Sequence, residues 1–180
     1  MSGSRLWMAA ALLGASAVTL SEPTNFRVGV GSFQLDSDPA PAYLPDNSDT
    51  GFSLFAEMPQ SNHTATRFML YRIDQDDKFS SGFQTQLMWG IGLSQPGFRA
   101  YTGPSWHHEK NRLTRAGKNH QVFNGWGWQL GLGYQYKSVT LDLAATVRDP
   151  SDYRTEYRRA GLGKKTPSVY TTNLLIGYRF

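Results

Sequence analysis

The fold is decided by the stretch Trp126-Gly127-Trp128-Gln129-Leu130-Gly131-Leu132-Gly133-Tyr134-Gln135-Tyr136. Every second residue is aromatic or leucine, and the residues between them are glycine or glutamine. This period of two predicts a β-strand, because residues that share a helical face lie three or four positions apart. The aromatic residues stand at both ends of the apolar face. That arrangement is typical of a strand that faces lipid and reaches an interfacial aromatic girdle on each side.

The same alternation recurs along the chain and predicts eight strands, an even number as closed bacterial barrels require. The last strand ends in an aromatic residue, Phe180, which suits an interfacial girdle. We therefore predict an all-β fold, an eight-stranded antiparallel transmembrane up-and-down β-barrel. A secreted lipocalin-type barrel is the alternative, but it would turn its apolar face inward. The expected strands cover residues 25–35, 52–57, 67–71, 83–93, 97–106, 126–136, 139–148 and 168–180.

The first residues have the pattern of a secretory signal peptide. Arg5 supplies the positive charge, residues 6–13 form a short apolar run, and Ala15-Ser16-Ala17 offers small residues for cleavage. The apolar run is shorter than the roughly 20 residues of a membrane-spanning helix. We expect a signal peptide over residues 1–17, with cleavage as late as residue 21 as the alternative, and a barrel over residues 25–180. Export together with a barrel predicts the outer membrane of a Gram-negative cell.

The chain contains no cysteine, which excludes disulfides, a thiol nucleophile and thiolate metal sites. Its mean hydropathy of -0.45 is compatible with a barrel, in which lipid-facing residues alternate with polar lumen residues. An exported barrel also has no sensible nucleic-acid partner. We expect neither a cofactor nor a metal.

The connections between the expected strands differ in length and in charge. Those over residues 35–50, 74–80, 107–121 and 149–167 are long or polar, and those near residues 60–62, 95–96 and 137 are short. Short turns are periplasmic and longer loops external in such barrels, so both termini should lie on the periplasmic side. The early long connections are acidic, with Asp46, Asp49, Asp76 and Asp77 among their residues. Basic residues gather in the late ones: Lys110, Arg112, Arg115, Lys118, Arg154, Arg158, Arg159, Lys164 and Lys165.

These basic residues are the main functional candidates. Arginine and lysine suit phosphate and sulfate groups, through fork geometry and point charge respectively. We expect them to contact lipid A phosphates, core sugars or sulfated host glycans. Pairing with the acidic connections is the alternative.

Several charged residues fall on the polar, inward face of the expected strands. Eight strands leave an interior just wide enough for side chains to fill, and an unpaired buried charge is costly. We expect the two carboxylates to pair with the arginines and form a packed polar core; an ion path or proton relay is the alternative. The residues are Arg27, Glu57, Arg67, Arg99, Asp142, Arg148 and Arg179.

The stretches over residues 124–136, 139–143 and 173–180 resemble the Ail/Lom/outer-membrane-protein-X family of small outer-membrane barrels. The resemblance implies a monomeric, non-enzymatic barrel whose loops contact host surfaces, complement regulators or lipopolysaccharide. Phe180 is similar to the terminal aromatic signal by which barrel proteins reach the barrel-assembly machinery. Leu175 departs from the family pattern, which would have glycine there.

Other eight-stranded barrels modify lipid A, so a hydrolase is the enzymatic alternative. The His-x-Ser pair of such deacylases is absent. Ser105, His107 and Glu109 alternate along one strand face and are the candidate catalytic residues of that alternative. His107, His108 and His120 lack the spacing of a metal site and are expected to be solvated loop residues. The predicted function is thus non-enzymatic adhesion or envelope protection, with a lipid A-modifying enzyme and a purely structural envelope barrel as alternatives.

Overall fold

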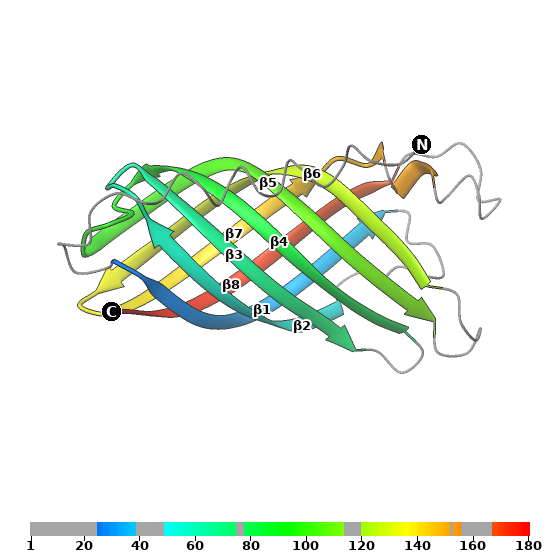
Figure 1. The fold of residues 1–180 in the computed structure, drawn as a ribbon, viewed down its shortest axis with the longest axis horizontal. Helices are drawn as coiled ribbons and strands as arrows, with labels where there is room; N and C mark the ends of the chain where they lie inside the picture. The colour runs from blue at the N-terminus through cyan, green and yellow to red at the C-terminus, as the bar shows by residue number, and fades with distance from the viewer. Residues whose placement is uncertain (1–24, 39–48, 75–77, 114–119, 152, 156–166) are drawn as a thin grey trace, which may run out of the picture.

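Eight antiparallel strands form a closed barrel in the computed structural model (Figure 1). The structure describes residues 25–38, 49–74, 78–113, 120–151, 153–155 and 167–180. Each strand pairs with its neighbours in sequence, and β1 pairs with β8 to close the wall. The predicted fold class is confirmed. The strands are β1 Arg27–Asp38, β2 Asp49–Pro59, β3 Thr64–Asp74, β4 Lys78–Ile91, β5 Gly97–Leu113, β6 His120–Tyr136, β7 Val139–Arg148 and β8 Ser168–Arg179.

Strands β5 and β6 are longer than the sequence pattern predicted, with 17 residues each. The expected connection over residues 107–121 is therefore wrong for most of its length. Lys110 pairs with Val122 and Arg112 with His120, so backbone pairing carries both strands past the point where the apolar alternation ends. Lys110 and Arg112 consequently belong to a strand rather than to a loop.

The apolar face of the strands points outward, as the aromatic belts predicted. Trp126 and Leu130 of β6 are each 62% exposed, and the polar residues between them face the lumen. Leu93 contradicts the predicted facing: it is fully buried, because β4 ends at Ile91 and the following turn folds inward. Within the described residues, no helix has the length and apolar character needed to cross a membrane.

The strand pairing is shifted in register around the barrel. A path of paired residues that leaves β1 at Arg27 and crosses every strand returns to β1 ten residues farther on, at Ser37. This stagger makes the strands tilt relative to the barrel axis, as Figure 1 shows. The path runs through Arg27, Glu57, Arg67, Gln86, Ser105, Gly127, Arg148, Val169 and Ser37.

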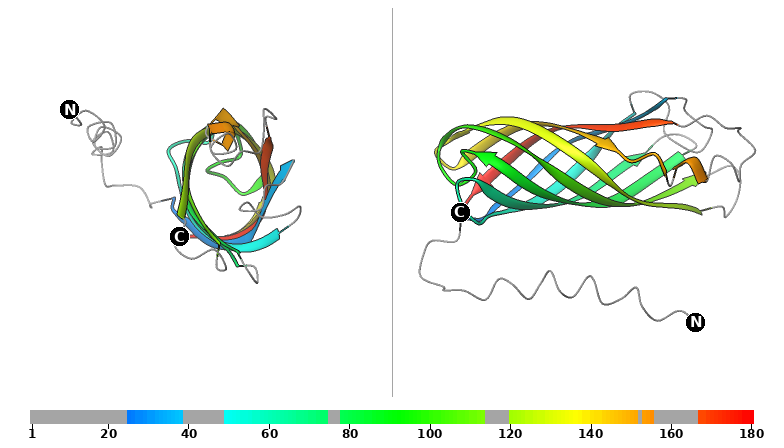
Figure 2. Two further views of the ribbon diagram at one scale, coloured as in Figure 1. Left: turned by 90° about the vertical axis from the view of Figure 1, so that its right-hand side faces the viewer. Right: turned by 90° about the horizontal axis from the view of Figure 1, so that it is seen from above.

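The two ends of the barrel are different. One end, called here the short-turn end, holds the turns at residues 60–63, 92–96 and 137–138 together with Asn25 and Phe180 (Figure 1). At the opposite loop end, a helical turn follows β7 and reaches residue 155 (Figure 2). The Arg154 N–H donates to the Pro150 carbonyl at 2.8 Å, which closes this turn.

Candidate functional site: the closed lumen and the basic rim

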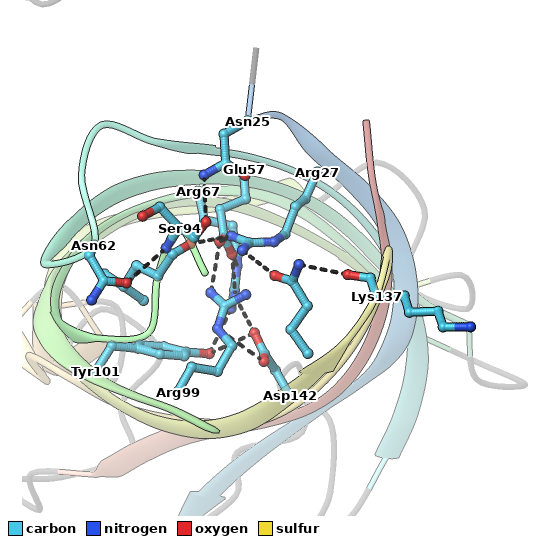
Figure 3. Close-up of polar contacts among 12 residues, drawn as sticks. Asn25, Arg27, Glu57, Asn62, Arg67, Ser94, Arg99, Tyr101, Lys137 and Asp142 are labelled. Atoms are coloured by element: carbon cyan, nitrogen blue, oxygen red, sulfur yellow. Dashed lines mark hydrogen bonds and ion pairs between the residues drawn. The ribbon is translucent and has the colours of Figure 1, made fainter. Parts of the chain in front are cut away.

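An ionic cluster fills the lumen near the short-turn end (Figure 3). Its centre is Glu57, whose Oε1 accepts hydrogen bonds from Arg27 Nη1 at 2.6 Å and from Arg99 Nη2 at 2.7 Å. The other oxygen, Oε2, accepts from Arg67 Nη2 at 2.6 Å. We call this group, completed by Asp142, the inner ionic layer. Its ion-paired side chains are at most 3% exposed.

Asp142 and Tyr101 hold the second side of the inner ionic layer. Asp142 Oδ2 accepts from Arg67 Nη2 at 2.5 Å, and Oδ1 lies 3.4 Å from Arg99 Nε. The Tyr101 hydroxyl accepts from Arg67 Nη1 at 2.9 Å. The structure thus brings together five of the predicted lumen charges at this end. Arg179 lies half-buried at the rim, and no described carboxylate side chain pairs with it.

The inner ionic layer also fastens the cover of the short-turn mouth. Arg27 Nη1 donates to the Leu93 carbonyl at 2.6 Å, and Arg27 Nη2 donates to Gln135 Oε1. Asn25 Nδ2 donates to the Ser94 carbonyl at 3.2 Å. These bonds hold the turn after β4 over the barrel end, which explains the burial of Leu93 (Figure 3).

A second ionic cluster, the outer ionic layer, lies toward the loop end. Arg148 Nη1 donates to Glu109 Oε2 at 2.6 Å and to the Tyr153 hydroxyl at 2.8 Å. The Tyr71 hydroxyl donates to Glu109 Oε2 at 2.7 Å and accepts from Arg148 Nη2 at 3.1 Å. Tyr153 is fully buried, and its ring stacks on Phe123 at 4.6 Å between centroids.

Tyr153 belongs to the helical turn after β7 and was missed by the sequence analysis. A signal for this turn is present in Asp149-Pro150. Aspartate is a preferred helix N-cap, and proline is favoured at the first helical position. Asp149 Oδ1 accepts from the Ser151 N–H at 3.0 Å, as an N-cap does. The turn brings Tyr153 into the barrel mouth.

Uncharged polar side chains fill the lumen between the two ionic layers. Ser105 lies between Tyr101 and Glu109 along β5, and Thr146 lies between Asp142 and Arg148 along β7. Several polar atoms of this middle layer have no hydrogen-bond partner among the described residues. Buried groups of this kind are commonly satisfied by internal water. The middle layer consists of Gln84, Gln86, Ser105, Gln129, Thr146 and Asn173, all buried.

The candidate catalytic residues Ser105, His107 and Glu109 all face the lumen from β5 and are buried. No hydrogen bond joins any two of these three residues in the structure. His107 Nε2 lies 3.3 Å from the Tyr153 hydroxyl, and Glu109 is bound in the outer ionic layer. The expectation that His107, His108 and His120 are solvated loop residues is wrong, because all three lie on strands β5 and β6, and His107 is buried. Among the described residues, no cluster of three or more His, Cys, Asp or Glu side chains could hold a metal.

Toward the loop end, the side chains on the outward face of β5 and β6 change from aromatic to polar. Trp106 stacks on His108 at 6.4 Å between centroids, and His108 Nδ1 lies 2.5 Å from Asn124 Oδ1. Lys110 is exposed two residues farther along β5. We call Trp106, His108, Lys110, Asn124 and Trp126 the rim ledge.

The remaining predicted basic residues are only partly described. Arg154 lies half-buried on the helical turn. Arg112 lies on β5 and His120 on β6, but the side chains of these two residues are outside the described part of the structure. The others, like the expected signal peptide over residues 1–17, lie outside the described residues: Arg115, Lys118, Arg158, Arg159, Lys164 and Lys165.

Comparisons with known proteins identify the fold. No protein-family model and no curated protein sequence matches the chain. Among solved structures, Ail, the attachment invasion locus protein of Yersinia pestis, crystallised with the heparin analogue sucrose octasulfate, is 14% identical with a TM-score of 0.49; the match covers 87% of this chain and 97% of Ail. Neisserial surface protein A is 18% identical with a TM-score of 0.51, over 88% of this chain and 98% of that one. The resemblance predicted from sequence is confirmed in the fold: the chain has the fold of a small eight-stranded β-barrel, similar to that of Neisserial surface protein A.

Proposed function

We propose that this chain is a non-enzymatic, monomeric barrel of the bacterial outer membrane whose loop end binds polyanions. The ligand class is phosphorylated or sulfated glycan, as in lipopolysaccharide or a host-surface polysaccharide. A signal peptide over residues 1–17 directs its export, and Phe180 is read by the barrel-assembly machinery. The observation that carries the proposal is the closed lumen, since both mouths are filled by buried ionic layers. Ligands then meet the outer surface, where the late connections are strongly basic.

The rim ledge supports this proposal with described side chains. Tryptophan is enriched where a membrane meets water, so Trp106 and Trp126 mark the interface on β5 and β6. Lys110 lies four residues beyond Trp106 on the same strand face, past the aromatic belt. This position supports contact between its ammonium group and the phosphates of glycolipid head groups. Arg112 follows on the same strand.

The arrangement of β5 argues against a hydrolase. A serine nucleophile needs a hydrogen-bonded base that is itself oriented by a third group. Ser105 has no such bond, and Glu109 is held by Arg148 and Tyr71 instead of orienting His107. All three side chains lie inside the barrel beneath Tyr153. An acyl chain in the membrane faces the opposite side of this strand.

Binding of heparin and of purified lipopolysaccharide to the barrel in nanodiscs tests the proposal. A variant with Lys110, Arg112, Arg115 and Lys118 changed to alanine should bind at least tenfold more weakly and show a shallower salt dependence. The control changes two basic residues at the short-turn end, Lys137 and Arg179, to alanine and should bind as the wild type does. Undiminished binding by the quadruple variant would contradict a role for these four residues, and no binding of either polyanion by the wild-type chain would leave a purely structural envelope barrel as the function.

The enzymatic alternative has a separate test. Mass spectra of lipid A from cells with and without the protein should be the same. Loss or gain of one acyl chain would overturn the non-enzymatic proposal. Ser105→Ala would then show whether β5 carries the activity.

A further inference from the structure

The inner ionic layer has unequal numbers of positive and negative groups. Three guanidinium groups, those of Arg27, Arg67 and Arg99, face two carboxylates, those of Glu57 and Asp142. No other carboxylate side chain among the described residues lies within ion-pair distance of these arginines. The layer therefore carries one excess positive charge in a site without solvent exposure. An uncompensated buried charge of this kind is strongly unfavourable.

The excess charge can be assigned to the Arg27 and Arg99 side of the layer. Arg67 is the best-satisfied arginine, with hydrogen bonds to Glu57, Asp142 and Tyr101. Arg27 and Arg99 instead share one carboxylate oxygen as a hydrogen-bond acceptor, Oε1 of Glu57. The other acceptors of Arg27, the Leu93 carbonyl and Gln135 Oε1, are uncharged. Their two guanidinium groups are consequently close together and repel each other.

The same two arginines also have hydrogen-bond donors without acceptors. Nε of Arg27 and Nη1 of Arg99 are buried, and neither has a partner among the described residues. Arg99 Nε reaches Asp142 Oδ1 only as an ion pair at 3.4 Å, without a hydrogen bond. Unmade bonds of buried charged donors are the most costly kind. Figure 3 shows both guanidinium groups inside the lumen, below the turn that carries Ser94.

We propose that the inner ionic layer is a binding site for one small monovalent inorganic anion of the chloride class, held between Arg27 and Arg99. One negative charge brings the layer to neutrality, whereas a phosphate dianion would replace the excess positive charge with a negative one. A monatomic anion accepts from donors in any direction, so it suits two guanidinium groups fixed by other partners. The site goes beyond the proposed polyanion binding, which concerns the opposite end of the barrel.

Crystals of the full barrel grown in sodium bromide test the site directly. Anomalous scattering should place a bromide inside the lumen in contact with Arg99 Nη1 and Arg27 Nε. Bromide found only on the surface, or water at this position, would overturn the proposal. The experiment uses the wild-type chain and does not depend on the folding of a variant.

Reversible urea unfolding at constant ionic strength tests the energetic role of the anion. Chloride at ten times its Kd should lower the unfolding equilibrium constant about tenfold relative to gluconate, which is too large to enter. Arg99→Gln removes the excess charge and should abolish this difference. The control Arg72→Gln alters an exposed arginine and should keep the chloride response. An anion-independent wild type, or phosphate that stabilises more than chloride, would contradict the assignment.

Discussion

The two ionic layers of the lumen are built around the same local pattern. Each contains a tyrosine whose ring rests on a glycine of the next strand: Tyr101 on Gly131, and Tyr71 on Gly82. In both pairs a Cβ added at the glycine would lie 2.2 Å from the tyrosine ring. Each tyrosine hydroxyl then bonds to an arginine and a carboxylate. The absence of a side chain on one strand thus lets the neighbouring strand place a hydroxyl at the centre of each layer.

The layers differ in how their charges are held. Every residue of the inner ionic layer comes from the barrel wall, and its central carboxylate, Glu57, has three arginine partners. Among the described residues, the outer ionic layer has one carboxylate, one arginine, Tyr71 of β3 and a second tyrosine, Tyr153, which the connection after β7 supplies. The inner closure is therefore part of the wall, whereas the outer closure depends on Tyr153. A barrel can thus be closed at one end by side chains of its strands and at the other by a residue of a connection.

Removing the central carboxylate of each layer should give the largest difference between them. Glu57→Gln leaves three buried arginines with one carboxylate, and we expect it to lower the free energy of unfolding by about 3–5 kcal/mol. Glu109→Gln leaves one buried arginine, Arg148, without its carboxylate, but Arg148 keeps its hydrogen bonds to two tyrosine hydroxyls. The loss in unfolding free energy should therefore be smaller than for Glu57→Gln. Urea unfolding in lipid vesicles, followed by tryptophan fluorescence, measures both. A greater loss for Glu109→Gln would reverse the ranking of the layers.

Filling the glycine positions should disturb each layer through its tyrosine. Gly131→Ala and Gly82→Ala each force a ring to move, with an expected loss of about 1–3 kcal/mol in unfolding free energy. In a Tyr101→Ala background the cost of Gly131→Ala should disappear, because the clashing ring is gone. An unchanged cost in that double-mutant cycle would mean that glycine acts through the backbone alone.

Removing the hydroxyl of Tyr153 tests how much the closure of the loop end depends on the connection after β7. Tyr153→Phe keeps the stacking on Phe123 but removes one of the two acceptors of Arg148 Nη1, so we expect the free energy of unfolding to fall by about 1 kcal/mol. Circular dichroism should show an intact barrel. Tyr153→Ala should still give no conductance in planar bilayers, because the inner ionic layer remains closed. An ion current through that variant would contradict closure by the strands.

Breaking an exposed ion pair outside the lumen should give the smallest change in unfolding free energy, against which the buried pairs can be compared. Arg72 and Asp74 pair at 2.8 Å on β3 with side chains that are each 61% exposed. Asp74→Asn should change the free energy of unfolding by less than about 1 kcal/mol. The change should shrink further in high salt, because solvent and ions screen exposed charges. A loss as large as that of Glu57→Gln would show that burial does not set these energies.

The period-of-two pattern was enough to predict the barrel, because the facing of a strand residue is a local property. It assigned Trp126 outward and Glu57 inward from alternation alone. The end of β5 could not be predicted in this way, since residues 107–112 stay in the strand through pairing with β6, and Leu113 pairs with Lys78 of β4. Leu93 was misplaced for a related reason: the turn that carries it is fixed by Arg27, 66 residues away in sequence. Tyr153 likewise depends on stacking with Phe123, a distant residue in sequence that only the closed fold brings to it.

The shift in strand register around the barrel also connects the two ionic layers. Arg27, Glu57 and Arg67 lie at the start of one continuous row of paired residues, and Arg148 lies near its end. A slip of two residues at the seam between β1 and β8 would keep every apolar side chain outward. It would nevertheless move Arg27 about 7 Å along the wall relative to Gln135, beyond the reach of a hydrogen bond. For a fixed number of strands the stagger sets the width of the barrel, so the charged interior selects the diameter that lipid contact alone would leave undetermined.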